Sequence, residues 1–115
     1  MTKFEKMVIL KDKKQHVFSY QITVHNLGKD IVQLISRKWI IKDAHSDIKK
    51  VEGPGVIGKQ PVIKPGEQFS YSSWCPLSTE IGKMYGHFNM KRLDNDEMFE
   101  ATVPHFQFHS DFVLN

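Results

Sequence analysis

Single-residue alternation between apolar and polar side chains is the feature of this chain that most limits how it can fold. Between Phe18 and His25 every second side chain is apolar, and the same period returns at 69–72, 84–90 and 99–103. A period of two places the apolar side chains on one face of an extended strand, and no stretch shows the 3.6-residue period of an amphipathic helix. The sequence therefore predicts an all-β sandwich or barrel, in which Pro104 is expected to end the last strand.

The run 31–42 changes parity partway along. Its apolar residues stand at even positions at first and at odd positions from Trp39 onward. A β-bulge around 36–38 would cause this change by adding one residue to the strand. In the alternative interpretation, the side chains of Ile35, Trp39 and Ile41 face inward throughout, with Arg37 beside them. Both interpretations describe a strand.

The segment Gly53–Pro61 has the GxGxxG spacing of a dinucleotide-binding fingerprint, in surroundings that exclude that motif. The fingerprint needs a strand before it and a helix after it. Here Pro54 lies inside the motif, Pro61 closes it and Pro65 follows, and proline both lacks an N–H and disfavours helix in the residue before it. The segment is therefore predicted to be a rigid connection between strands, with at least one glycine at positive φ.

The length and composition fit one domain with one core over residues 1–115. The chain is 40% hydrophobic, and its longest apolar runs are far shorter than a membrane span of about 20 residues. The first residues contain no long apolar stretch typical of a secretory signal. The single cysteine, Cys75, cannot form an internal disulfide. These features predict a cytoplasmic protein without membrane insertion.

The charge of the chain suggests a nucleic-acid partner, but its distribution argues against one. The net charge is +3 and the pI is about 9.0, yet Arg37 and Arg92 are the only arginines among the sixteen basic residues. Arginine is the residue type suited to bidentate contacts with phosphate and guanine. The densest cluster, Lys11–Lys14, is interpreted as a solvated turn between two strands. No nucleic-acid partner is therefore expected.

The glycine segment is nevertheless a candidate anion site. Gly53, Gly55 and Gly58 would let backbone N–H groups converge, Lys59 would add positive charge, and Arg37 would join them if the bulge brings it near. The ligand would be a phosphate-containing small molecule. In the other interpretation, the glycines supply only turn dihedrals and close packing. Both remain open, because the segment lacks the Gly-Lys-Ser/Thr ending of a P-loop.

Neither a metal site nor a catalytic centre is predicted. His105 and His109 are four residues apart, which suits one ion on a helix but places them about 13 Å apart on an extended strand. Cys75 stands between Trp74 and Pro76 with no basic neighbour in the sequence, which favours a half-buried structural thiol. The acidic residues form no recognisable acid–base pair. The protein is expected to need no cofactor and not to be an enzyme.

A set of short motifs, in a fixed order over most of the chain, matches one known domain family. In chain order they are Asn26-Leu27-Gly28, Val32-Gln33-Leu34, Ser36-Arg37, Trp39-Ile40-Ile41, Gly53-Pro54-Gly55-Val56, Gly58, Gln60-Pro61, Pro65-Gly66, Tyr71, Ser73, Cys75-Pro76-Leu77, Gly82, Met84, Gly86, Val103-Pro104 and Phe106. From about Phe18 to Phe108 the chain resembles the ApaG domain family. Lys38 and Lys59 depart from it, since histidine and glutamate are common at those positions.

The resemblance implies an immunoglobulin-like or fibronectin type III-like β-sandwich of seven or eight strands. Its core is expected to include Trp39, Tyr71, Phe88 and Val103. The family implies a free-standing bacterial protein or a module at the end of some F-box proteins, and its bacterial members carry a name tied to cobalt and magnesium efflux. We expect a non-enzymatic module that binds a protein partner, as a soluble accessory factor in divalent-cation homeostasis. The alternative is a sensor of a pyrophosphate-containing nucleotide, or another anion, at Gly53–Pro61.

Overall fold

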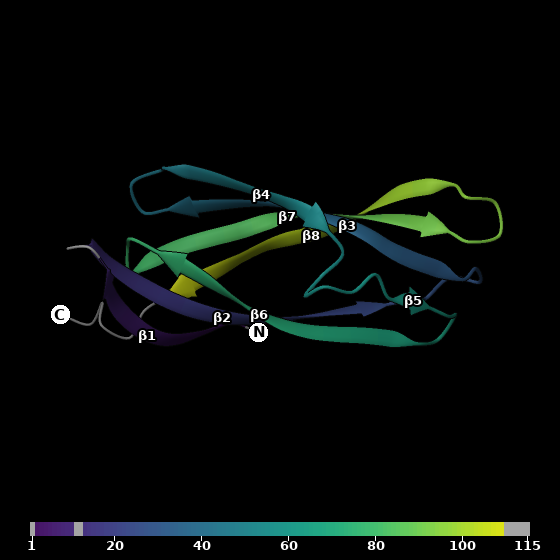
Figure 1. The fold of residues 1–115 in the computed structure, drawn as a ribbon, viewed down its shortest axis with the longest axis horizontal. Coiled ribbons are helices and arrows are strands. Elements are labelled where there is room, and N and C mark those ends of the chain that lie inside the picture. The colour runs from purple at the N-terminus through teal and green to yellow at the C-terminus, as the bar shows by residue number, and fades with distance from the viewer. Residues whose placement is uncertain (1, 11–12, 110–115) are drawn as a thin grey trace.

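The computed structural model describes residues 2–10 and 13–109, and side chains from Gln15 onward. The described residues form eight antiparallel strands in two packed layers (Figure 1). They are β1 (Thr2–Leu10), β2 (Lys13–His25), β3 (Val32–Asp43), β4 (Ile48–Pro54), β5 (Val62–Ile63), β6 (Gln68–Leu77), β7 (Ile81–Arg92) and β8 (Met98–His109). The predicted all-β sandwich is confirmed.

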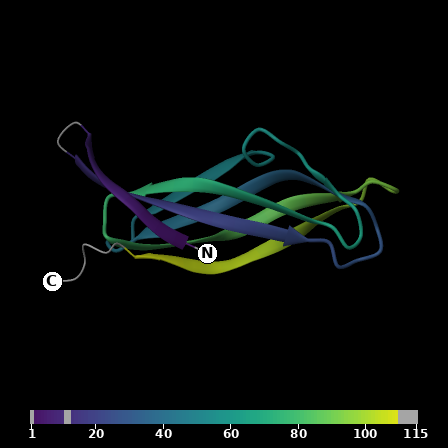
Figure 2. The same cartoon turned by 90° about the horizontal axis from the view of Figure 1, so that it is seen from below.

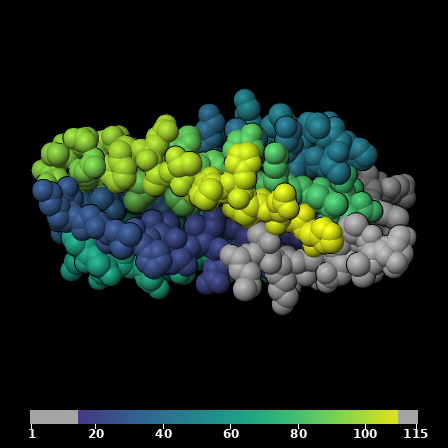
Figure 3. Space-filling view, turned by 180° about the vertical axis from the view of Figure 1, so that it is seen from behind, coloured from purple at the N-terminus to yellow at the C-terminus, as the bar shows by residue number. Residues whose placement is uncertain are grey.

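Two sheets of unequal size form the sandwich. The smaller has the order β1-β2-β6, and the larger has the order β4-β3-β7-β8, with β5 paired to the start of β3. The molecule is elongated, with extents of 52 × 22 × 21 Å, and its strands run roughly along the long axis (Figure 2). Seen from behind, the side chains of β8 run beside those of β2 (Figure 3). No helix among residues 2–10 and 13–109 has the length and apolar character to cross a membrane.

The core lies between the two sheets and is rich in aromatic residues. Trp39, Tyr71 and Phe88 are buried as predicted, and Val103 is partly buried and packs against them. The indole of Trp39 meets Phe88 edge-on at 5.4 Å between ring centroids. Edge-to-face contacts of this kind add to the free energy gained from burying the rings.

Of the two interpretations of the run 31–42, the structure shows the bulge, slightly earlier in β3 than expected. The register with β7 shifts between Leu34 and Ser36, which leaves Ile35 as the extra residue. The side chains that face the core therefore change from even to odd positions, so that Leu34 and Trp39 are both buried.

The last strand does not end at Pro104 as predicted, because a second bulge accommodates the proline. Met84 pairs with Phe106 and Gly86 with Val103, so Pro104 and His105 together stand opposite one residue of β7. A residue in a bulge need not donate an N–H to the ladder, and β8 continues to His109.

Other differences from the predictions lie near the chain start and after the glycine segment. The alternation did not reveal the two-residue β5, and a strand before Lys11 is expected only because a turn between two strands is predicted at Lys11–Lys14. Of the turn predicted at Lys11–Lys14, residues 11 and 12 lie outside the described residues, and the prediction is wrong for Lys13 and Lys14, which belong to β2 and pair with the end of β1.

Candidate functional site

The glycine segment between β4 and β5 is fastened to the bulge in β3. The N–H of Gly55 donates to the carbonyl of Ile35 at 2.7 Å, and Nε2 of Gln60 donates to the same oxygen at 2.9 Å. The bulge leaves Ile35 out of the register with β7, so its carbonyl can accept both hydrogen bonds. The segment is therefore held in one place, as its prolines predicted.

Within the segment, residues 56–59 form a tight two-residue turn. The N–H of Val56 donates to the carbonyl of Lys59 at 2.8 Å, and the N–H of Lys59 returns a bond of 2.9 Å. Both central residues have positive φ, 43° at Ile57 and 75° at Gly58, as in a type I′ turn. Gly55 also has positive φ, and a Cβ there would overlap the carbonyl of Lys59. The predicted left-handed glycines are thus present.

Arg37 lies against the same segment. Its Nη1 donates to the carbonyls of Pro54 at 3.2 Å and Gly55 at 2.8 Å. The guanidinium occupies the space above Gly53, where a Cβ would lie 3.0 Å from Nη1. The structure therefore brings Arg37 to Gly53 and Gly55, while Lys59 is exposed at the turn.

Most of the converging groups in the segment already have partners. The N–H groups of Gly55, Val56 and Lys59 donate to carbonyls of the protein, and Pro54 and Pro61 have no N–H. The groups left for an anion are the backbone amides at 57, 58 and 60 and the exposed side chain of Lys59. The geometry supports a structural role for the first two glycines and leaves only these groups for a ligand.

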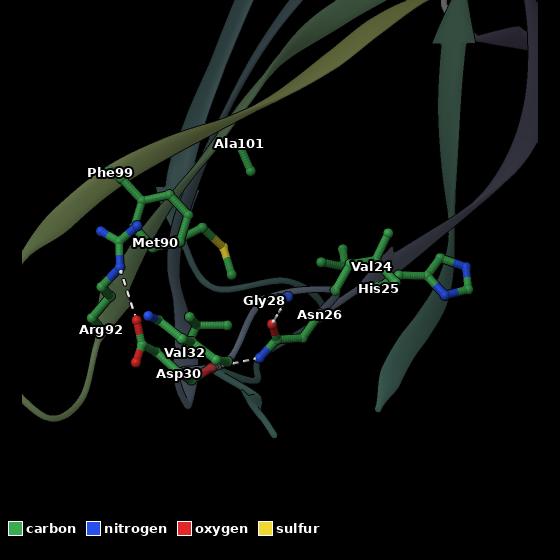
Figure 4. Close-up of a pocket in the computed structure, with 12 residues that line it drawn as sticks. Val24, His25, Asn26, Gly28, Asp30, Val32, Met90, Arg92, Phe99 and Ala101 are labelled. Carbon is green, nitrogen blue, oxygen red and sulfur yellow. Dashed lines mark hydrogen bonds and ion pairs between the residues drawn. The ribbon is translucent and has the colours of Figure 1, made fainter. Parts of the chain in front are cut away.

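A pocket of about 260 Å³, here called the end pocket, opens at one end of the sandwich (Figure 4). Its lining combines the loop between β2 and β3 with apolar side chains from both sheets. These apolar side chains are Val24, Val32, Met90, Phe99 and Ala101. Concave, mostly apolar surfaces with a few polar groups are typical of binding sites.

Asn26 holds the loop at the end pocket in place. Its Nδ2 donates to the carbonyls of Asp30 at 2.8 Å and Ile63 at 2.9 Å, and its Oδ1 accepts from the N–H of Gly28 at 3.0 Å. The main chain of Asn26 also bonds to residues 66 and 67. One buried amide thus joins two connections, a role that the sequence indicated only through the turn-forming character of Asn26-Leu27-Gly28.

The arginine at the end pocket already has acidic partners, whereas Lys29, which also lines the pocket, is in none of the ion pairs found among the described side chains. Arg92 donates to Glu97 at 2.7 Å, lies 3.6 Å from a carboxylate oxygen of Asp30, and stacks over Phe99 at 4.4 Å (Figure 4). A guanidinium with two carboxylate partners has little remaining charge to attract an anion. The apolar part of its lining suits the end pocket to an apolar side chain.

Exposed apolar side chains surround this end of the molecule. The N–H of Leu93 donates to the carbonyl of Ile31, and β5 pairs with the start of β3 beside them. Of the nine exposed large apolar side chains in the described part of the chain, five belong to this end: Leu27, Ile31, Val62, Leu93 and Met98. Leu27 is 91% exposed.

The remaining candidates from the sequence do not form a reactive centre in the parts of the chain that the structure describes. Cys75 is more deeply buried than expected, and burial raises the pKa of its thiol to about 11, against a lowering effect of Lys49. His105 and His109 are exposed on β8, where the ring of His105 stacks on Tyr85 at 4.0 Å. No three His, Cys, Asp or Glu residues in these parts are grouped to hold a metal ion.

These features define a small antiparallel β-sandwich domain whose glycine–proline connection is fastened to a bulged strand. The chain belongs to the ApaG domain family, which it matches over residues 9–92. It is 45% identical over 107 residues to Protein ApaG of Azorhizobium caulinodans, covering 90% of this chain and 82% of the relative.

Two solved structures have the same fold. An X-ray structure of a Northeast Structural Genomics Consortium target is 33% identical, with a TM-score of 0.93 over 99% of this chain and 86% of that chain. The crystal structure of a protein from Bordetella pertussis that carries the name ApaA is 34% identical, with a TM-score of 0.84 over 96% of this chain and 89% of that chain.

Proposed function

We propose that this protein is a non-enzymatic recognition module that binds a protein partner at the end of the sandwich, over the end pocket. The observation that carries this proposal is the number of exposed apolar side chains at that end of the sandwich, of which Leu27 also lines the pocket. Contiguous apolar surface rimmed by polar groups is typical of protein interaction sites. Leu27 is the most exposed of these side chains and would act as an anchor.

The loops of this end are suited to binding because they are fixed before a partner arrives. Asn26 fastens the loop between β2 and β3 to Ile63 after the glycine segment, and Arg92 joins Asp30 to the hairpin between β7 and β8. Loops that are already ordered lose less conformational entropy on binding.

The resemblance to the family extends this proposal to a physiological role. The name of the bacterial members implies a soluble accessory factor in cobalt and magnesium homeostasis, acting in the cytoplasm. In this role the module would act through its protein partner.

Affinity capture with matched variants tests the proposal. Leu27→Glu places a charge in the apolar patch, and Ile48→Glu makes the same change at an exposed position of β4, away from the end pocket. We expect a specific partner to be retained by the wild type and by Ile48→Glu and to be lost from Leu27→Glu. Equal retention by the two variants would place the interface elsewhere.

A second candidate function is a sensor of a pyrophosphate-containing nucleotide at the glycine segment. It is favoured by the positive φ of Ile57, a conformation that β-branched residues rarely adopt outside functional or strained turns. Titration with inorganic pyrophosphate should then shift the amide resonances of residues 57 and 58, and Lys59→Glu should abolish the shift. Glutamate is common at that position in the family. A response to pyrophosphate that survives Lys59→Glu would therefore show that Lys59 is not required for binding.

A further inference from the structure

A second pocket, of about 210 Å³, opens between β4 and β6 on one side of the sandwich. β4 is an edge strand of the larger sheet, and β6 is an edge strand of the smaller sheet. This side pocket is lined by Arg37, Lys49, Trp39, Ser73, Trp74 and Cys75, among others. It shares no residue with the end pocket, so an inference about it stands apart from the proposed function.

The strand register turns two cations toward the inner side of the larger sheet. Lys49 stands directly opposite Ile41, and Gly53, under the guanidinium, stands opposite Arg37. Residues directly opposite each other in an antiparallel pair project to the same face. Because Ile41 and Trp39 are buried and share the odd positions of β3, Arg37 and Lys49 lie on the core-facing side.

These two cations have no acidic partner among the side chains described from Gln15 to His109. The lining of the side pocket contains no Asp or Glu, and the ion pairs found in that range involve other basic residues. The hydrogen bonds of Arg37 to Pro54 and Gly55 go to neutral carbonyls. Both positive charges therefore remain without a counter-charge at the pocket.

The lining also holds a buried donor without an acceptor. Trp39 is 2% exposed, and its Nε1 has no hydrogen-bond partner in the described structure. An indole N–H can only donate, and leaving such a group buried and unbonded is unfavourable. An acceptor that entered the pocket and reached this N–H would satisfy it, and with two cations in the same lining an anionic acceptor fits best.

The other polar groups of the pocket do not supply that negative charge. Burial keeps the Cys75 thiol protonated at neutral pH, because it raises the pKa to about 11. Burial also raises the pKa of the Tyr20 phenol, although Ser73 and Arg37 act in the opposite direction. The pocket lining therefore supplies no negative charge to balance Arg37 and Lys49.

We propose that the side pocket binds a doubly charged oxyanion, such as a phosphate group, between Arg37 and Lys49. The oxyanion accepts hydrogen bonds from the free guanidinium N–H groups and from the Lys49 ammonium. Trp74, which is 59% exposed beside the pocket, covers the apolar part of the molecule that carries the anion. The phosphate belongs either to a small metabolite or to a phosphorylated side chain of a peptide.

The test is a titration of the full chain followed by NMR, reading the Trp39 indole N–H and the backbone amides. The probes are inorganic phosphate, phenyl phosphate and a short peptide with a central phosphoserine. Lys49→Gln removes one pocket cation, and Lys50→Gln makes the same change on the next residue of β4, which faces outward opposite Ile40. We expect a saturable shift of the indole signal, weakened about tenfold by Lys49→Gln and little changed by Lys50→Gln.

The relative affinities of the probes identify the source of the phosphate. Tighter binding of phenyl phosphate than of the phosphopeptide indicates a small metabolite, and the reverse order indicates a modified protein segment. Equal weakening by both lysine variants would show non-specific attraction and overturn the proposal. So would shifts confined to residues 57–59, or no saturable shift with any probe at physiological salt. Arg37→Lys, which keeps the charge but changes the hydrogen-bond geometry, serves as a second variant.

Discussion

Arg37 lies over Gly53, the residue that stands opposite it in β4, and uses the space that a side chain would fill to reach the carbonyl of Gly55. This contact joins β3 to the start of the glycine segment. It explains why a cation on the core-facing side of a strand is tolerated, since the backbone of the segment supplies two of its hydrogen-bond acceptors.

Gly53→Ala should therefore destabilise the protein by displacing the guanidinium. A loss of about 1–2 kcal/mol is expected from weakened hydrogen bonds to Arg37. Urea denaturation measures this loss, and the control is Gly53→Ala in an Arg37→Ala background. If the cost arises from the guanidinium, it should nearly vanish there, so an equal cost in both backgrounds would contradict this explanation.

Gly55→Ala should be more damaging than Gly58→Ala. Both residues have positive φ, so each alanine is strained by about 1 kcal/mol. At Gly55 the new Cβ would also overlap the carbonyl of Lys59, whereas Gly58 has open space around it. Denaturation midpoints in urea should fall in that order. The same midpoint for both variants would show that the turn can shift to accommodate a side chain.

Asn26→Ala should loosen the end pocket and lower the free energy of unfolding by about 2–4 kcal/mol, because the substitution removes three hydrogen bonds of a buried group. Amide hydrogen exchange should become faster at Gly28 and Gly66 together, since the main chain of residue 26 also bonds Gly66. Exchange that increases at only one of these glycines would mean that the two connections are held independently.

The buried thiol predicts a loss of stability in mild alkali. The folded-state pKa of Cys75 is raised to about 11 from 9.0, so the unfolded chain releases its proton first as pH rises. The contribution of the protonated Cys75 thiol to the free energy of unfolding is fully present below pH 9. It is lost progressively as pH rises through the folded-state pKa, by about 2–3 kcal/mol in all. Unfolding free energies measured between pH 8 and 10 check this against Cys75→Ala, in which the decline should be much smaller.

Trp39→Ala should cost about 3–5 kcal/mol through lost contacts and the cavity left behind. Trp39→Phe should cost much less, because the indole N–H that it removes has no acceptor among the described residues. Both values come from chemical denaturation, and a similar loss in the two variants would imply an acceptor for that N–H in solution.

The sequence predicted the architecture because the alternation of apolar and polar side chains lies within each strand, and it can be recognised without knowing how the strands pair. The parity change before Trp39 indicated a bulge around residues 36–38, one to three residues from its observed position at Ile35. The expectation that such a bulge would bring Arg37 near the glycines is met in the structure. The sequence could not show that Pro104 lies inside a strand, since a missing N–H matters only once the opposite residue is known. The sequence also could not show which of Lys49 and Lys50 projects toward the core, because the direction of each side chain depends on how β4 pairs with β3.

The second bulge has a consequence for self-association. At the end of the larger sheet, β8 presents twelve residues along which a second molecule could dock its own edge and begin an aggregate. Pro104 and the doubled position beside it interrupt the row of donors near the middle of that strand. The longer exposed edge of this sheet is thereby divided into two short segments. A proline that the sequence suggested would end a strand therefore opposes edge-to-edge polymerisation.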